Sequence, residues 1–124
     1  MLRLAEYIAE RYKKVAEIGI GNYTAVAEYL ASRGLRVIAT DVKEVRSKVD
    51  FFIDDIRNPK IQLYNGVELL YSIRPPPELF KYIIGLADRL KADCIIKPLF
   101  GDHADGKLVN YKGLGFYIWK KNSF

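Results

Sequence analysis

The chain has 124 residues, of which 50% are hydrophobic and 13% aromatic, and its charged residues give a net charge of +5. This length fits one domain over residues 1–124, because compact domains cluster near roughly 100–150 residues. The hydrophobic fraction excludes a disordered chain, and the single cysteine excludes disulfide frameworks and metal sites built on several cysteines. No apolar run reaches the roughly 18–20 residues that cross a bilayer and no signal-peptide pattern opens the chain. We therefore expect a soluble, cytoplasmic protein without membrane contact.

The first half of the chain alternates helical and strand patterns. Residues 2–13 repeat apolar side chains at three- and four-residue spacing, which predicts an amphipathic helix. Residues 14–21 predict a short buried strand that runs into a glycine turn, and residues 24–33 predict a second helix. Two more short apolar strands, each closed by acidic residues, are predicted at 36–41 and 51–55.

The second half continues the alternation. Residues 67–72 predict a strand that ends at an Arg-Pro-Pro-Pro sequence, and residues 78–91 give the strongest helical pattern in the chain. Residues 94–99 predict another buried strand, and residues 107–111 and 116–120 flank a glycine-containing turn typical of a hairpin.

Continuous apolar strands that alternate with helices indicate a parallel sheet covered on both faces. The sequence therefore predicts an α/β, Rossmann-like fold with a mostly parallel sheet, helices on both faces and a C-terminal antiparallel hairpin. The connections at 42–50 and 56–66 are too short or too irregular for full helices.

The glycine turn after the first strand is the most informative segment. Gly19 and Gly21 leave backbone N–H groups exposed beside a helix start, where a ligand can approach without meeting a Cβ atom. Asp41 follows Gly21 by twenty residues, at the end of the next strand, the position that reaches ribose hydroxyls in this fold. Thr24 stands where a dinucleotide fingerprint has its third glycine, and the acidic Glu17 suits a ligand with an ammonium group better than a pyrophosphate. These residues favour a nucleoside-type small molecule, although two glycines after a strand are also common turn chemistry.

The pattern Glu17-x-Gly19-x-Gly21 with Asp41 resembles the cofactor motif of class I S-adenosylmethionine-dependent methyltransferases. The resemblance implies that Gly19 and Gly21 line the methionine part of S-adenosylmethionine. It also implies that Glu17 contacts the amino group of this cofactor, often through water, and that Asp41 binds the ribose hydroxyls.

Two further segments extend the resemblance. The pair Asp54 and Asp55 matches the place where the methyltransferase family positions an acid near the adenine amino group. A second resemblance, to a family of small archaeal proteins catalogued as uncharacterised and Rossmann-like, covers nearly the whole chain; its sequence strings lie at residues 5–10, 17–21, 54–56 and 71–79.

The proline segment is where a second substrate is expected. In amino-methylating relatives, an Asp or Asn before two prolines accepts hydrogen bonds from the target amine at this place. Arg74 stands here instead, and a guanidinium only donates hydrogen bonds, so we do not expect that mechanism. Arg74 is suited to a carboxylate or phosphate, with Tyr71, Ser72 and the stiff Pro75-Pro76 pair facing the substrate. The prolines also fit a purely structural function, ending the strand and starting the next helix.

Two other segments carry weaker signals. His103 lies in a polar Gly-Asp-His-Ala-Asp-Gly loop, where a solvated histidine is more common than a metal ligand, so no metal is expected. In the C-terminal hairpin, aromatic residues alternate with lysines. This alternation fits RNA binding, and it equally fits a half-buried hairpin whose edge lysines suppress aggregation.

Two functions remain open from the sequence. The first is an S-adenosylmethionine-binding domain that acts as a minimal methyltransferase, with no catalytic residue identifiable. The alternative is a non-catalytic nucleotide-binding module that acts through a protein or RNA partner; a dinucleotide-binding domain is a weaker third option.

Because the predicted elements use nearly every residue, no residues are left for a lid that covers a substrate. For an enzyme we therefore expect a partner, or a second copy in a homodimer, to complete the active site.

Overall fold

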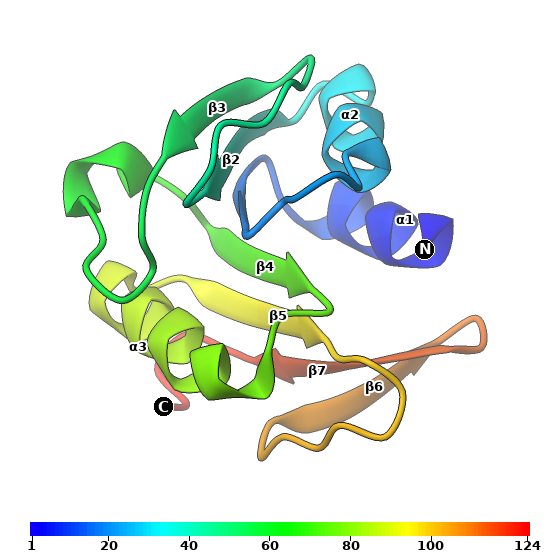
Figure 1. The fold of residues 1–124 in the computed structure, drawn as a ribbon. Helices are drawn as coiled ribbons and strands as arrows, with labels where there is room; N and C mark the ends of the chain where they lie inside the picture. Colours follow the sequence, from blue (N-terminus) through cyan, green and yellow to red (C-terminus); the bar gives the residue numbers. More distant parts are fainter.

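The computed structural model describes residues 1–124, which form one seven-stranded sheet in the order β3-β2-β1-β4-β5-β7-β6 (Figure 1). The strands are β1 (Lys14–Ile18), β2 (Arg36–Asp41), β3 (Asp50–Ile53), β4 (Leu69–Ile73), β5 (Asp93–Lys97), β6 (Lys107–Tyr111) and β7 (Leu114–Trp119).

The first five strands are all parallel, and β7 runs antiparallel to both β5 and β6. The predicted mostly parallel sheet with a C-terminal antiparallel hairpin is therefore confirmed. From β1 the chain moves outward to β2 and β3, then returns to place β4 on the other side of β1. Because the direction of the connections reverses between β1 and β4, their carboxyl ends form the position where α/β sheets bind ligands.

Three α-helices cover the sheet, two on one face and one on the other (Figure 1). α1 (Leu2–Arg11) and α2 (Ala25–Ser32) share a face, and α3 (Phe80–Leu90) covers the opposite face. Two 3₁₀ turns, η1 (Ile61–Tyr64) and η2 (Pro77–Leu79), complete the helical elements. None of the helices is long and apolar enough to cross a membrane.

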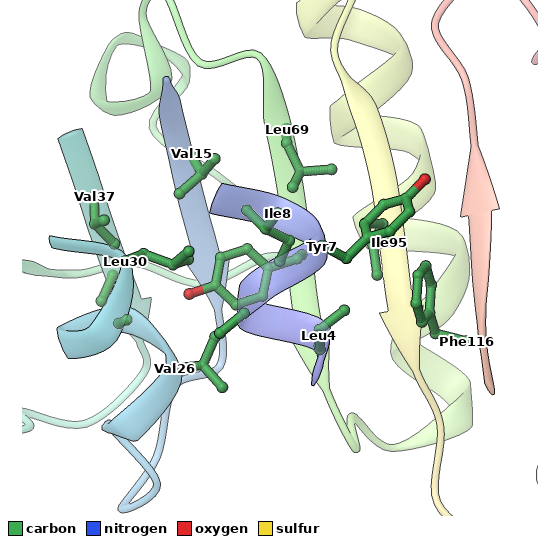
Figure 2. Close-up of a cluster of buried hydrophobic side chains, with 14 of the residues drawn as sticks. Leu4, Tyr7, Ile8, Val15, Val26, Leu30, Val37, Leu69, Ile95 and Phe116 are labelled. Atoms are coloured by element: carbon green, nitrogen blue, oxygen red, sulfur yellow. The ribbon is translucent and has the colours of Figure 1, made fainter. Parts of the chain in front are cut away.

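Each face of the sheet has its own hydrophobic core. Figure 2 shows the core under α1 and α2, where Leu4 and Ile8 of α1 and Leu30 of α2 meet strand residues such as Val15 and Leu69. These five side chains are fully buried. Burial of a residue of this kind stabilises the fold by about 1.5–3 kcal/mol, so the alternation of strand side chains between two cores holds the sheet in place.

Gly106 packs directly against the only tryptophan, Trp119, at the end of β7. A Cβ atom at Gly106 would lie 2.6 Å from two carbon atoms of the indole ring, so Gly106→Ala must displace that ring. We expect the unfolding free energy to fall by about 1–3 kcal/mol and the native fluorescence of Trp119 to change. The matched control is Gly85→Ala in α3, where the added Cβ meets no atom within 4 Å. Equal stabilities and unchanged fluorescence in urea titrations of both variants would contradict this packing.

Candidate functional site

A pocket of about 260 Å³ lies at the carboxyl ends of β1, β2 and β4. Its apolar wall comes from Ile18, Ile56 and Ile83, which belong to the core under α3, so the pocket opens on the α3 face of the sheet. The polar and proline residues that line it are Gly19, Thr40, Asp41, Asp54, Ser72, Arg74, Pro75 and Pro76. Many of the residues predicted from the sequence therefore meet at one position, the reversal point between β1 and β4.

The glycine turn is fastened to the end of β2 by backbone and side-chain hydrogen bonds. The N–H of Gly19 donates to the carbonyl of Thr40 at 2.9 Å, and the N–H of Gly21 donates to Oδ2 of Asp41 at 2.8 Å. Both glycines have positive φ angles, +68° at Gly19 and +55° at Gly21, which side-chain-bearing residues rarely adopt. A Cβ atom at Gly19 would meet nothing within 4 Å. Glycine is therefore required there by the backbone conformation, and the space beside it is open.

Asp41 is held on both of its carboxylate oxygens. Besides the bond from Gly21, Oδ1 accepts the N–H of Val42 at 2.7 Å. A carboxylate offers about four acceptor positions, and these two backbone donors use one on each oxygen of Asp41. Asp41 thus fixes the shape of the glycine turn and retains the ability to accept hydrogen bonds.

Asp54 is the buried acid of the pocket. Only 6% exposed, it accepts the N–H of Lys60 at 3.0 Å on Oδ1 and the hydroxyl of Tyr64 at 2.5 Å on Oδ2. Burial, and then the hydrogen bond to Asp54, raises the pKa of Tyr64 well above its usual range, so this hydroxyl remains a donor. Sequence reasoning missed Tyr64, because it lies in η1, a segment without helical or strand periodicity.

The structure separates Asp55 from its neighbour. Asp55 is exposed and does not line the pocket; its Oδ1 accepts the N–H of Arg57 at 2.9 Å in a local turn. Adjacent residues at a strand end point in different directions, so only one of the two acids faces the pocket. That acid is Asp54.

Glu17 and Tyr71 pair with each other on the other face of the sheet. Tyr71 belongs to the core under α1 and α2, and its hydroxyl donates to Oε1 of Glu17 at 2.8 Å. Glu17 is 1% exposed, and burial raises its pKa to about 8 although the bond from Tyr71 acts in the opposite direction. Neither residue lines the pocket. The structure therefore gives Glu17 a partner within the protein, and it does not bring its carboxyl group to the ligand position that the resemblance implied.

Ser72 and the prolines form another part of the pocket wall. The hydroxyl of Ser72 donates to the carbonyl of Ile18 at 2.7 Å, which ties β4 to β1 at the pocket. Pro75 is buried and Pro76 exposed, and both line the pocket. Their fixed φ angles make this wall stiff, so the prolines both end β4 and shape the pocket.

Arg74 stands at the mouth of the pocket in an uncommon backbone conformation. Its φ angle is +54°, and its N–H donates to the carbonyl of Lys97 at 2.6 Å, which holds this conformation in place. The left-handed region costs a residue with a Cβ roughly 1–2 kcal/mol. The guanidinium carbon lies 5.6 Å from the ring centre of Tyr23, an exposed residue of the glycine turn that the sequence did not single out. Arg74 therefore lies between the proline wall and the glycine turn, with its side chain exposed.

The weaker sequence candidates lie elsewhere. His103 is exposed, and its Nδ1 lies 3.2 Å from the hydroxyl of Tyr117. The single cysteine, Cys94, is buried in β5, where burial raises the pKa of its thiol far above the usual range. Two of the hairpin aromatics pack on the protein itself: Phe116 is fully buried, and the hydroxyl of Tyr111 donates to Glu10 of α1 at 2.6 Å.

Solved structures that resemble this fold include methyltransferases. The chain is similar to the 1,6-didemethyltoxoflavin-N1-methyltransferase of Burkholderia thailandensis, solved with its substrate and S-adenosylhomocysteine, with a TM-score of 0.55 and 16% identity over 97% of this chain and 61% of that one. The antibiotic-resistance methyltransferase Kmr matches with a TM-score of 0.55 and 11% identity, over 85% of this chain and 68% of that one. A Streptococcus pneumoniae protein proposed to be an NADH-flavin reductase matches with a TM-score of 0.51 and 22% identity, over 63% and 41%. The chain spans less than two thirds of the first and third of these proteins, and the likeness establishes the fold.

Relatives of the same size come from archaea. A protein of Archaeoglobus fulgidus is 50% identical over 127 residues, covering 100% of this chain and 98% of the relative. A protein of Pyrococcus abyssi is 39% identical over 130 residues, covering 97% and 99%. Both are described as UPF0146 proteins, and the model of that family matches residues 1–121. The archaeal resemblance of the sequence is confirmed, and the chain belongs to the uncharacterised protein family UPF0146.

Proposed function

We propose that this chain binds S-adenosylmethionine in the pocket at the carboxyl ends of β1, β2 and β4. The observation that carries the proposal is the convergence of Gly19, Asp41, Asp54 and Arg74 on one pocket at the reversal point of the sheet. The dinucleotide alternative lacks a third glycine, since Thr24 occupies that position.

The residues fit the chemistry of the cofactor part by part. Asp41 keeps free acceptor positions beside the glycine turn, as ribose hydroxyls require. Asp54, an acceptor inside the pocket, suits the donating amino group of adenine, and the open space at Gly19 admits the methionine part. Glu17 is assigned a structural function with Tyr71, because its carboxyl group is buried away from the pocket.

S-adenosylmethionine supplies an activated methyl group, and its transfer depends mainly on alignment with the acceptor atom. On this proposal the chain acts as a minimal methyltransferase, and Arg74 contributes alignment rather than proton transfer. Its guanidinium at the pocket mouth would bind a carboxylate or phosphate of the second substrate. The left-handed backbone of Arg74 supports this assignment, because strained residues held in place by their surroundings gather at functional sites.

The test is calorimetric titration of the purified chain with S-adenosylmethionine, S-adenosylhomocysteine and NADH. We expect heat of binding with the first two ligands and none with NADH. The absence of heat with either adenosyl ligand at high micromolar protein would contradict the proposal, and tight NADH binding would favour the dinucleotide alternative. Binding without methyl incorporation into RNA, protein or small molecules of a cell extract would support the non-catalytic module.

A further inference from the structure

The amino ends of the strands carry two adjoining hollows, at the opposite edge of the sheet from the proposed cofactor pocket. One, of about 700 Å³, lies where β4 and β5 begin, and the other, of about 430 Å³, lies where β1 and β2 begin. Gln62 of η1 lines both hollows, so they adjoin along this edge. Because β7 is antiparallel, its last residues also come to this edge, and Lys121 lines the larger hollow.

These hollows concentrate the positive charge of the chain. Three acidic residues line them, Asp50, Glu68 and Asp93, against seven basic ones: Lys14, Arg36 and Lys48 in the smaller hollow, and Arg11, Arg89, Lys91 and Lys121 in the larger. The net charge of this lining is +4, out of +5 for the whole chain. The cofactor pocket has the opposite balance, with two acids against Arg74 alone. The two edges of the sheet are thus electrostatically distinct.

The acids of the larger hollow already have donors from the protein. Oε1 of Glu68 accepts the N–H groups of Lys13 and Lys14 at 2.7 and 3.1 Å, which lower its pKa. Asp93 accepts the hydroxyl of Tyr12 at 2.6 Å and the N–H of Lys121 at 2.7 Å. Burial raises the pKa of Asp93, but these bonds lower it more, so both acids are ionised. Their role is to hold loops together, and they leave most of the basic side chains without a partner.

Three of those basic side chains, Lys48, Arg89 and Lys121, are exposed and make no side-chain hydrogen bond or ion pair. They come from three segments: the connection before β3, the last turn of α3 and the tail after β7. A site for one phosphate needs several donors that converge on the same group. Exposed cations spread along two hollows fit a chain of regularly spaced negative charges instead.

We propose that this edge of the sheet binds the phosphodiester backbone of a nucleic acid strand, which lies along both hollows. A flexible strand can follow the surface of the hollows, whereas a flat anionic membrane would meet only their rims. The site differs from the one the sequence suggested, because two of the hairpin aromatics, Phe116 and Tyr111, make internal contacts and the cations come from other elements. It is independent of the cofactor proposal, since no residue is shared between the two linings.

The test measures fluorescence anisotropy of a labelled single-stranded RNA of about 20 nucleotides over a range of salt concentrations. The variant K48Q/R89Q/K121Q removes three cations of the hollows. Its control, K43Q/R46Q/K81Q, removes two lysines and one arginine that are also exposed but lie outside both hollows. The wild type should bind with an affinity that falls steeply with salt. At about 100 mM salt the first variant should bind at least tenfold more weakly than the wild type. The slope of log affinity against log salt should be shallower by about 2, because each of the three lost phosphate contacts contributes roughly 0.7.

The control variant should bind RNA with an affinity within about threefold of the wild type. Its salt slope should differ from that of the wild type by no more than about 0.5. Equal weakening of the two variants would overturn the proposal, because it would show a response to net charge alone. Absence of RNA binding at low salt would overturn it as well, and so would binding to phosphatidylglycerol vesicles in place of RNA. Unchanged thermal unfolding and unchanged heat of S-adenosylmethionine binding in both variants verify that the fold and the other site are intact.

Discussion

Replacing Asp41 with asparagine is expected to weaken S-adenosylmethionine binding by about ten- to a hundredfold. The change keeps the shape of the side chain and removes its charge. Hydrogen bonds to charged groups contribute about 1.5–3 kcal/mol each, so losing the charge-assisted bonds to the ribose hydroxyls gives an effect of that size. Asp41 accepts the Gly21 and the Val42 N–H groups on two different oxygens, whereas asparagine has only one acceptor oxygen and an amide nitrogen that donates. The glycine turn would therefore lose one of its ties to β2.

The matched control is Asp55→Asn. Asp55 undergoes the same chemical change, but it lies outside the pocket lining and accepts only a local backbone N–H from Arg57. Calorimetry with S-adenosylmethionine should give the wild-type affinity for this variant. If the Asp41 variant and the wild type bind with equal affinity, Asp41 is not part of the site. If only the Asp55 variant loses affinity, Asp55 and not Asp41 is the acid that binds the ligand.

Replacing Glu17 with glutamine is expected to remove a large pH dependence of stability. The pKa of Glu17 is raised from 4.5 to about 8 in the folded protein, because its carboxyl group is buried. Between these two values the native state keeps a proton that the unfolded chain has released, so the unfolding free energy falls as the pH rises. The slope approaches about 1.4 kcal/mol per pH unit for one group. In urea unfolding, the wild type and the variant should therefore have similar unfolding free energies at pH 5. At pH 8 the unfolding free energy of the variant should exceed that of the wild type by several kcal/mol.

Tyr71→Phe separates the charge of Glu17 from its hydrogen bond. This variant removes the hydroxyl that donates to Glu17 at 2.8 Å. In the wild type that hydrogen bond lowers the pKa of Glu17 and so partly offsets the effect of burial. The variant should be less stable than the wild type by about 1–3 kcal/mol, because a buried carboxyl group loses its partner, and it should keep the fall of stability with pH. Parallel pH profiles for the wild type and the Glu17 variant would show that this carboxyl group titrates normally.

The fold follows from the sequence wherever periodicity is strong. The strands at 36–41 and 107–111 have the predicted bounds, and the connections at 42–50 and 56–66 contain no α-helix. The predicted helix at 78–91 begins instead as the 3₁₀ turn Pro77–Leu79, because consecutive prolines restrict the backbone before the first α-helical turn. The sequence predicts the mostly parallel sheet and the terminal hairpin, whereas the order of the strands within the sheet comes from the structure.

The site is predictable only to the level of segments. Gly19 and Asp41 are found from spacing, because both lie at strand ends that parallel pairing brings together. Which of Asp54 and Asp55 faces the pocket depends on the exact end of β3. Whether Glu17 faces the pocket depends on which face of the sheet the pocket opens on. The sequence does not predict that face, because strand side chains alternate between the two faces. Tyr64 reaches Asp54 only through the irregular segment between β3 and β4.

The most direct test of the cofactor site is a crystal structure of the chain grown with S-adenosylhomocysteine. We expect the ribose at Asp41, the adenine beside Asp54, and the amino acid part along the turn at Gly19, with Glu17 still bonded to Tyr71. An empty pocket in crystals saturated with a ligand that the chain binds in solution, or a ligand seated at the amino ends of the strands, would contradict this expectation.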